Sequence, residues 1–296
     1  MLRPLNLSRS SSWAKRPQAF QPSDFQAYAL PALLPSGIAF GADFWAGNVI
    51  SQPDLVVAQL DFAWIRAGQG LLPDTGYKAT SAIFKGQKPR GPYWVYDARV
   101  NSDTHIGAIM KTIDLDSELP LWIDVELTIA GKTAANYWDD LSHILGTLTS
   151  ELGYKPIIYT GLWWWTPNML RPGLGVGGYP DWQSEFKFAL AEYPYSTDVV
   201  SCSWSDLKSK WLPAVRLPRL AAGILGSQVA DWQFSGDKFA LPGVTTSLGL
   251  PCKLDLNYVY DLNSILVKPV PPPVKTLDQR VKTLEDQAVA HQWVLN

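Results

Sequence analysis

The chain has 296 residues, of which 47% are hydrophobic and 18% are charged, and its formal net charge is −2. This length accommodates one large α/β domain or two smaller ones, and the small net charge excludes the global field with which basic proteins attract nucleic acid or an anionic membrane. No segment approaches the ~20 apolar residues of a membrane span, and the first ten residues lack a continuous apolar stretch. We therefore expect no nucleic-acid partner, no membrane partner and no secretory signal.

Aromatic residues are frequent, with 14 Trp and 12 Tyr in the chain. Exposed Trp and Tyr rings often line carbohydrate grooves, and a Trp-rich core is the alternative for about half of the Trp residues. Two distant cysteines, Cys202 and Cys252, either pair or stay free, and the three histidines are scattered. This pattern is unlike a zinc site, and we predict no metal and no cofactor.

Residues 1–36 form an N-terminal arm that contains Ser, Pro, Gln and four basic residues. We expect this arm to be extended. It is either disordered or an attachment segment.

Residues 37–267 form the body of the chain, in which apolar runs alternate with helical patterns. A helix is predicted over 134–152, where Leu141, Leu145 and Leu148 recur at helical spacing before Gly153 ends it. Strands that alternate with helices indicate a parallel α/β sheet, and at this length we predict an irregular TIM-like (β/α) barrel. The predicted strands are Gly37–Phe44, Phe62–Ala67, Tyr93–Tyr96, Leu121–Glu126, Pro156–Thr160, Phe186–Ala191 and Ala230–Phe234.

The C-terminal part begins with a proline-rich linker at 268–274, which predicts a stiff spacer. Residues 275–296 follow with apolar positions at alternating three- and four-residue steps, typical of a short coiled coil. An isolated helix of this length is marginal in water, so we expect it to associate with copies of itself or with a particle partner. A frayed single helix is the alternative.

Two acids two residues apart, Asp124 and Glu126, end one predicted strand. Side chains at i and i+2 share a face of a strand, so the two carboxyl groups are expected side by side. Repulsion and burial near Trp122 would raise at least one pKa, which is what a proton donor in glycoside cleavage needs. An N-cap or a structural ion pair is the alternative interpretation.

Other predicted strands also end in polar or aromatic residues. Their motifs, in chain order, are Gly41-Ala42-Asp43-Phe44-Trp45, Ile65-Arg66-Ala67-Gly68-Gln69-Gly70, Pro156-Ile157-Ile158-Tyr159-Thr160, Trp232-Gln233-Phe234 and Asp255-Leu256-Asn257. Together with the Asp-x-Glu strand, and in this order, they resemble the motifs of the glycoside hydrolase family 25 lysozymes, which are muramidases of bacteria, fungi and phages. The resemblance covers about residues 37–265.

The resemblance implies an enzyme that hydrolyses the β-1,4 bond between N-acetylmuramic acid and N-acetylglucosamine in bacterial peptidoglycan. It implies that Glu126 donates the proton, and that Asp124 stays ionised to stabilise the oxocarbenium-like centre or to orient the substrate's N-acetyl group. Asp43 and Asp255 would position substrate or adjust these pKa values, and Arg66 would balance the acids. The candidates for sugar contacts are Tyr159, Tyr96, Trp94 and Trp232, and Glu192 is a further acid near the site. Trp163, Trp164 and Trp165 are expected in a loop, with at least one exposed in the groove.

Two segments depart from the family pattern, namely 93–97 and 188–193, and both would reshape the groove without touching the acids. A non-catalytic structural or wall-binding component of a phage-like particle is the alternative function, since fold alone does not secure activity. The arm, linker and C-terminal helix favour incorporation in such a particle, where the protein would act outside the cell without a secretory signal. A chitinase-type hydrolase is the weaker third alternative, because Trp122 occupies the position of that family's additional acid.

Overall fold

The computed structural model describes residues 38–171, 178–193, 218–221 and 223–267. The predicted arm, the proline-rich linker, the C-terminal helix and Cys202 lie outside these ranges. Among the described residues, no helix is both long enough and apolar enough to cross a membrane.

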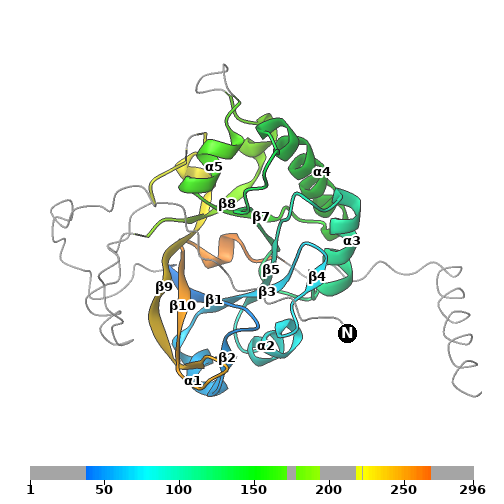
Figure 1. Ribbon diagram of the computed structural model, residues 1–296. Coiled ribbons are helices and arrows are strands. Elements are labelled where there is room, and N and C mark those ends of the chain that lie inside the picture. The colour runs from blue at the N-terminus through cyan, green and yellow to red at the C-terminus, as the bar shows by residue number, and fades with distance from the viewer. Residues whose placement is uncertain (1–37, 172–177, 194–217, 222, 268–296) are drawn as a thin grey trace, which may run out of the picture.

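Strands and helices alternate through most of the described chain (Figure 1). The strands are β1 (Ala39–Phe44), β2 (Val49–Ile50), β3 (Phe62–Gln69), β4 (Leu72–Pro73), β5 (Arg90–Val95), β6 (Trp122–Asp124), β7 (Ile157–Gly161), β8 (Lys187–Ala191), β9 (Val229–Thr245) and β10 (Pro251–Val259). The α-helices are α1 (Pro53–Gln59), α2 (Tyr77–Phe84), α3 (Ser102–Thr112), α4 (Ala134–Leu152) and α5 (Leu162–Met169). Short 3₁₀ helices span Asp181–Glu185, Gly226–Gln228 and Leu262–Ser264.

The sheet closes into a barrel in the order β1-β3-β5-β6-β7-β8-β9-β10, with β10 returning to β1. Neighbours from β1 to β9 are parallel, as the alternation of strands and helices predicts. The last strand is different, because β10 runs antiparallel to both β9 and β1. This strand was not among the predicted ones: a hairpin joins it to β9, so no helical pattern separates the two.

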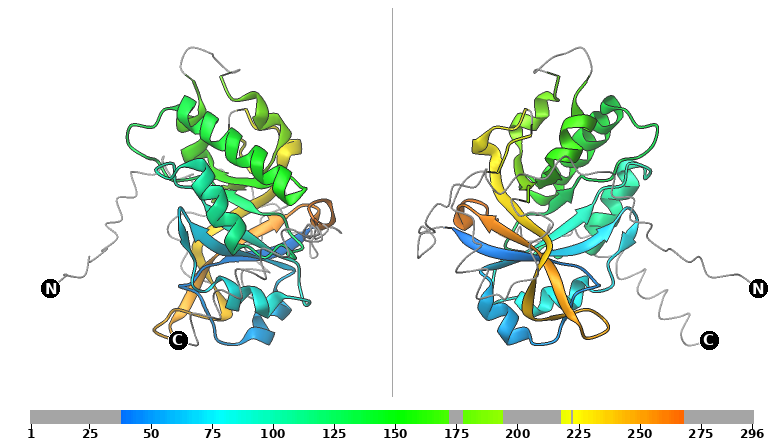
Figure 2. Two further views of the ribbon diagram at one scale, coloured as in Figure 1. Left: turned by 90° about the vertical axis from the view of Figure 1, so that its right-hand side faces the viewer. Right: turned by 60° about the vertical axis from the view of Figure 1, so that its left-hand side comes forward.

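The β9–β10 hairpin reaches beyond the barrel, where β2 pairs with β9 and α1 packs against it (Figures 1 and 2). Helix α4 has the bounds predicted from sequence. Its N-cap Thr133 accepts a hydrogen bond from the backbone of Asn136, and Gly153 ends it at a φ of +72°. Helix α5 corrects one prediction, because Trp163–Trp165 lie in this helix and not in a loop.

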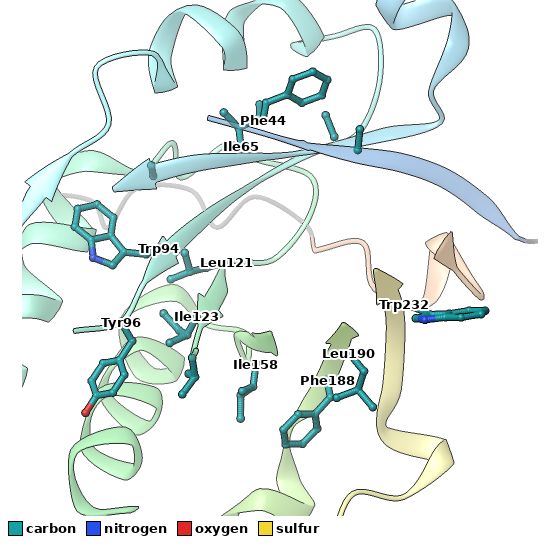
Figure 3. Close-up of a cluster of buried hydrophobic side chains, with 14 of the residues drawn as sticks. Phe44, Ile65, Trp94, Tyr96, Leu121, Ile123, Ile158, Phe188, Leu190 and Trp232 are labelled. Carbon is teal, nitrogen blue, oxygen red and sulfur yellow. The ribbon is translucent and has the colours of Figure 1, made fainter. Parts of the chain in front are cut away.

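Apolar side chains form two layers, one on each face of the barrel strands. The outer layer lies between strands and helices (Figure 3). The inner layer fills the barrel and contains a stack of three rings: Trp64 and Trp122 have centroids 4.1 Å apart, and Trp122 and Tyr159 have centroids 5.4 Å apart. This stack forms the floor of the carboxyl end of the barrel, since the residues that follow Trp122 and Tyr159 end their strands.

Candidate active site

Asp124 and Glu126 lie at the carboxyl end of β6, where the strand leaves the sheet. Asp124 is the last residue of β6, and its side chain is 5% exposed; Glu126 lies just beyond the strand and is half-buried. Backbone bonds continue past the strand, since the N–H of Val125 donates to the carbonyl of Tyr159 at 2.8 Å. The hydroxyl of Thr160 donates to the carbonyl of Val125, also at 2.8 Å. These bonds hold Glu126 next to Asp124.

The environment of the two acids favours their protonated forms. Burial raises the pKa of Asp124 well above its usual range; the carboxylates of Glu126 and Asp43 add to this shift, and the guanidinium of Arg66 opposes it. Burial also raises the pKa of Glu126. Oδ1 of Asp124 is buried and has no hydrogen-bond partner among the described residues. The pair is therefore suited to hold one proton between two carboxyl groups and to accept a hydrogen bond from a ligand.

Asp43, near the end of β1, is held by two side-chain amides. Nε2 of Gln233 donates to one of its carboxyl oxygens, and Nδ2 of Asn257 donates to the other, each at 2.7 Å. Burial raises the pKa of Asp43 well above its usual range, with repulsion from Asp255 and Asp231 adding to the shift, whereas the two amide bonds lower it. The amides thus fix this carboxyl group and compensate part of the cost of its burial.

Two tyrosines fix the orientation of Gln233. The hydroxyls of Tyr159 and Tyr193 both donate to Oε1 of Gln233, at 2.8 and 2.7 Å. Because Oε1 accepts two hydrogen bonds from the hydroxyls, the donor Nε2 must face Asp43. Tyr159, predicted as a sugar contact, is 6% exposed and forms part of the inner layer, so the structure gives it a role in ordering the acids.

Asp255 and Arg66 complete the group of charges at the barrel mouth. Asp255 pairs in register with Asp43 across β10 and β1 and is partly exposed. Arg66 donates from Nε to Asp74 at 2.7 Å, and its guanidinium lies 4.8 Å from the ring centroid of Trp45. The structure thus brings together Asp43, Asp124, Glu126, Asp255, Arg66 and Tyr159.

Four other predicted residues have buried side chains with partners of their own. Trp94, Tyr96 and Trp232 are at most 1% exposed and belong to the outer layer between strands and helices (Figure 3). Nε1 of Trp94 donates to Gly70, the hydroxyl of Tyr96 to Asp140, and Nε1 of Trp232 to the carbonyl of Glu192. The carboxylate of Glu192 is buried and paired with Arg219. These placements leave no surface for a sugar, so all four are left out of the site.

Strand alternation explains this difference and identifies residues that the sequence analysis did not select. Neighbouring residues on a strand face opposite sides, so Trp94 and Trp232 point outward while Tyr93 and Gln233 point inward. Burial, with the nearby charge of Asp43, raises the pKa of Tyr93. Polar residues at every second position would have identified the inward face of the last two strands. They are Asp231, Gln233 and Ser235 in β9, and Asp255 and Asn257 in β10.

Trp163 is an exposed aromatic residue at this end of the barrel. It lies at the start of α5, directly after β7, and is 40% exposed, whereas Trp164 and Trp165 are buried. Its ring packs against Tyr193 with centroids 5.7 Å apart. Trp163 is thus exposed, as predicted for at least one residue of the Trp163–Trp165 run, and its place in a substrate groove stays a prediction. Within the described ranges, no group of three or more His, Cys, Asp or Glu side chains is arranged to hold a metal ion.

Comparison with known proteins finds similar structures, whereas the two comparisons of sequence find no match. No family model matches the chain, and no curated protein matches it. Among solved structures, the Clostridium perfringens spore cortex lytic enzyme SleM is similar over 79% of this chain and 71% of its own, with 19% identity and a TM-score of 0.59. A bacterial lysozyme from Streptomyces coelicolor is similar over 78% of this chain and 96% of its own, with 17% identity and a TM-score of 0.58.

A family 25 glycosyl hydrolase from Bacillus anthracis is also similar, over 75% of this chain and 88% of its own, with 18% identity and a TM-score of 0.51. At these identities the likeness is one of fold. The resemblance indicated by the six ordered motifs is thus confirmed at the level of architecture: this chain has the barrel fold of the family 25 lysozymes.

Proposed function

We propose that this protein is a peptidoglycan hydrolase, an N-acetylmuramidase that cleaves the β-1,4 bond between N-acetylmuramic acid and N-acetylglucosamine. The observation that carries the proposal is the pair Asp124 and Glu126, held beside Asp43 at the barrel mouth with pKa values raised by burial. A wall-binding component has no use for neighbouring carboxyl groups whose burial costs free energy. The shared fold with lysozymes and a spore cortex lytic enzyme supports the same activity.

Glu126 is the proton donor in this proposal. It is more exposed than Asp124, so it can reach a glycosidic oxygen, and the raised pKa keeps it protonated until transfer. Burial raises the pKa of Asp124 as well, and the charge of Arg66 opposes this shift. In this proposal the counter-charge of Arg66 lets Asp124 carry the negative charge of the pair while Glu126 carries the proton. That carboxylate would stabilise an oxocarbenium-like centre.

The unpaired Oδ1 of Asp124 supports a second role for this residue. A buried acceptor without a partner costs about 1–3 kcal/mol, and a donor on the ligand would recover part of this cost. The N–H of an acetamido group is such a donor, and a hydrogen bond to it would orient the N-acetyl group as an internal nucleophile. Asp43 and Asp255 would then position substrate and adjust the two pKa values, as the resemblance implies.

The proposal is tested by solubilisation of purified peptidoglycan. Glu126→Gln keeps the shape of the side chain and removes the transferable proton, so we expect activity to fall by at least ~100-fold with unchanged unfolding. Glu151→Gln, an exposed change on α4, is the matched control and should retain full activity. A Glu126→Gln protein as active as the control would remove Glu126 from this role; binding of wall material without solubilisation by the wild type would favour the non-catalytic alternative.

We further propose that the protein acts outside the cell as part of a phage-like particle. Residues 268–296 would form a coiled coil, either with copies of the same chain or with a partner in the particle. The heptad spacing of this segment supports the proposal. Light scattering on the full chain and on a variant that ends at 267 tests it. An oligomer that becomes a monomer on truncation is the expected result, and a monomer in both would contradict self-association.

A further inference from the structure

A pocket of about 470 Å³ lies between the β3–β4 hairpin and the loop that follows β5. Its lining includes Arg66, Gly70, Leu72, Asp97 and Arg99. Strands β3 and β5 lie between β1, which carries Asp43, and β6, which carries Asp124. The pocket is therefore next to the proposed cleft, at the same end of the barrel.

Two local features of β3 open this space. The register between β3 and β5 shifts by one residue at Ala67, a bulge of the kind that redirects a strand near the rim of a barrel. Gly70, at a φ of +58°, then turns the chain into β4, and its N–H donates to the carbonyl of Val95 at 3.0 Å. The hairpin thus leaves the barrel wall, and Leu72 at its tip is 75% exposed.

The charges of the pocket are arranged with cations outward and anions inward. Asp74 and Asp97 have side chains only 2% and 9% exposed. Asp74 accepts from Nε of Arg66 and from the backbone of Gly76; Asp97 accepts from the backbone and side chain of Arg99.

The guanidinium groups are more exposed than the carboxylates they bind. The side chain of Arg66 is 20% exposed and that of Arg99 is 67% exposed. Asp97 accepts from Nε and Nη2 of Arg99, and Asp74 accepts from Nε of Arg66, so the other N–H groups of the two guanidinium groups are presented to a ligand. An anion in the pocket would meet positive charge without displacing an ion pair.

The pocket and the cleft share a wall. Arg66 lines the pocket and is also close enough to Asp124 to lower the pKa of that residue. The backbone that leads to Asp97 is bonded to β6, since the N–H of Tyr96 donates to the carbonyl of Asp124 at 2.9 Å. Arg66 and the strand end before Asp97 thus border both the pocket and Asp124.

We propose that this pocket is a subsite for the carboxylate-bearing peptide that muramic acid carries on its lactyl group, an inference that rests on the proposed function. The exposed guanidinium of Arg99 binds a peptide carboxylate. Leu71 and Leu72, 47% and 75% exposed, contact the methyl groups of its alanine residues. Glycan without peptide, such as chitin, leaves the subsite empty, so the pocket makes the protein selective for peptide-bearing strands.

The test is a binding measurement that does not depend on hydrolysis. N-acetylmuramyl-L-alanyl-D-glutamate and the same compound with its carboxyl groups amidated are titrated into the full chain by calorimetry. The acid form should bind the wild type about tenfold more tightly, as expected for one charge-assisted hydrogen bond. Arg99→Gln should abolish this difference, and so should Leu72→Glu, which adds a negative charge at an exposed position.

Lys155→Gln is the matched control, because Lys155 also forms an exposed ion pair, with Glu185, but precedes β7 at the opposite end of the barrel. It should keep the tenfold preference. Equal binding of the two compounds by the wild type, or a preference that survives in Arg99→Gln, would overturn the subsite. Preference for the acid form in a protein that releases no wall fragments would support the subsite and contradict the proposed hydrolase.

Discussion

Gln233 connects the acid Asp43 to the buried Tyr159 and the half-buried Tyr193, so its replacement by the similarly sized Leu should be costly. The substitution removes the amide that donates to Asp43 and the oxygen that accepts from Tyr159 and Tyr193. The carboxylate of Asp43 and the hydroxyls of Tyr159 and Tyr193 then each lose a partner. At about 1–3 kcal/mol each, and with the tyrosine hydroxyls able to turn toward the mouth, we expect a loss of about 3–6 kcal/mol in the free energy of unfolding. This is a large part of the ~5–15 kcal/mol typical of a domain.

Urea unfolding followed by Trp fluorescence measures this loss. Tyr159→Phe is the control: it removes one hydroxyl and leaves Gln233 bonded to Asp43 and Tyr193, so a loss of only about 1 kcal/mol is expected. The bond from Gln233 lowers the pKa of Asp43, so Gln233→Leu raises that pKa further. The loss should therefore be smaller at pH 5, where more Asp43 is protonated, than at pH 7. A Gln233→Leu protein whose free energy of unfolding lies within about 1 kcal/mol of that of the wild type would refute this account of the hydrogen bonds around Gln233.

Three further changes give distinct outcomes. Asp124→Asn should stabilise the protein by about 1 kcal/mol at pH 7, because a carboxyl group whose folded-state pKa is raised makes the protein less stable as the pH rises through that pKa. Thermal unfolding from pH 4 to 8 should show a gain in stability that grows with pH. A gain that shrinks with pH would contradict this expectation. Gly91→Ala would place a Cβ atom 2.2 Å from the buried ring of Trp64 and should lower the free energy of unfolding by more than ~2 kcal/mol. Gly146→Ala, with open space around it in α4, should raise that free energy by about 0.5–1 kcal/mol. Similar urea midpoints for the two variants would show that the side chains of the inner layer move to accommodate the added methyl group. Trp163→Ala should weaken binding of peptidoglycan fragments about tenfold with unchanged unfolding, and unaltered affinity in calorimetry would exclude this ring from the substrate groove.

Much of the barrel was predictable because apolar residues recur at a different spacing in its strands than in its main helix. The apolar spacing of α4, with Gly153 after it, predicts both ends of that helix. Buried runs such as Phe62–Ala67 predict the positions of the parallel strands to within a few residues. The antiparallel β10 was not predictable in the same way: its polar inward residues, Asp255 and Asn257, interrupt the apolar pattern by which a buried strand is recognised.

The acids of the candidate site were identified from sequence, whereas several of their neighbours were not. A carboxyl group at the end of a strand predicts that its side chain faces the barrel mouth, as for Asp43 and Asp124. Aromatic residues carry no such signal, because either face of a barrel strand buries a large ring: Trp122 faces inward and Trp94 outward. An inward and an outward ring can be distinguished only where the same strand carries an acid that faces inward, because alternation along the strand then fixes the direction of each residue. Strand β5 carries no such acid within its bounds.

The central claim, that Glu126 protonates the bond on the reducing side of muramic acid, is tested most directly by identifying the ends that are released. Purified peptidoglycan is digested, the new reducing ends are converted to sugar alcohols with borohydride, and these are counted by mass spectrometry. The account predicts muramitol from the wild type and from Glu151→Gln, and none above background from Glu126→Gln. Glucosaminitol, or muramitol from Glu126→Gln at the wild-type level, would contradict it.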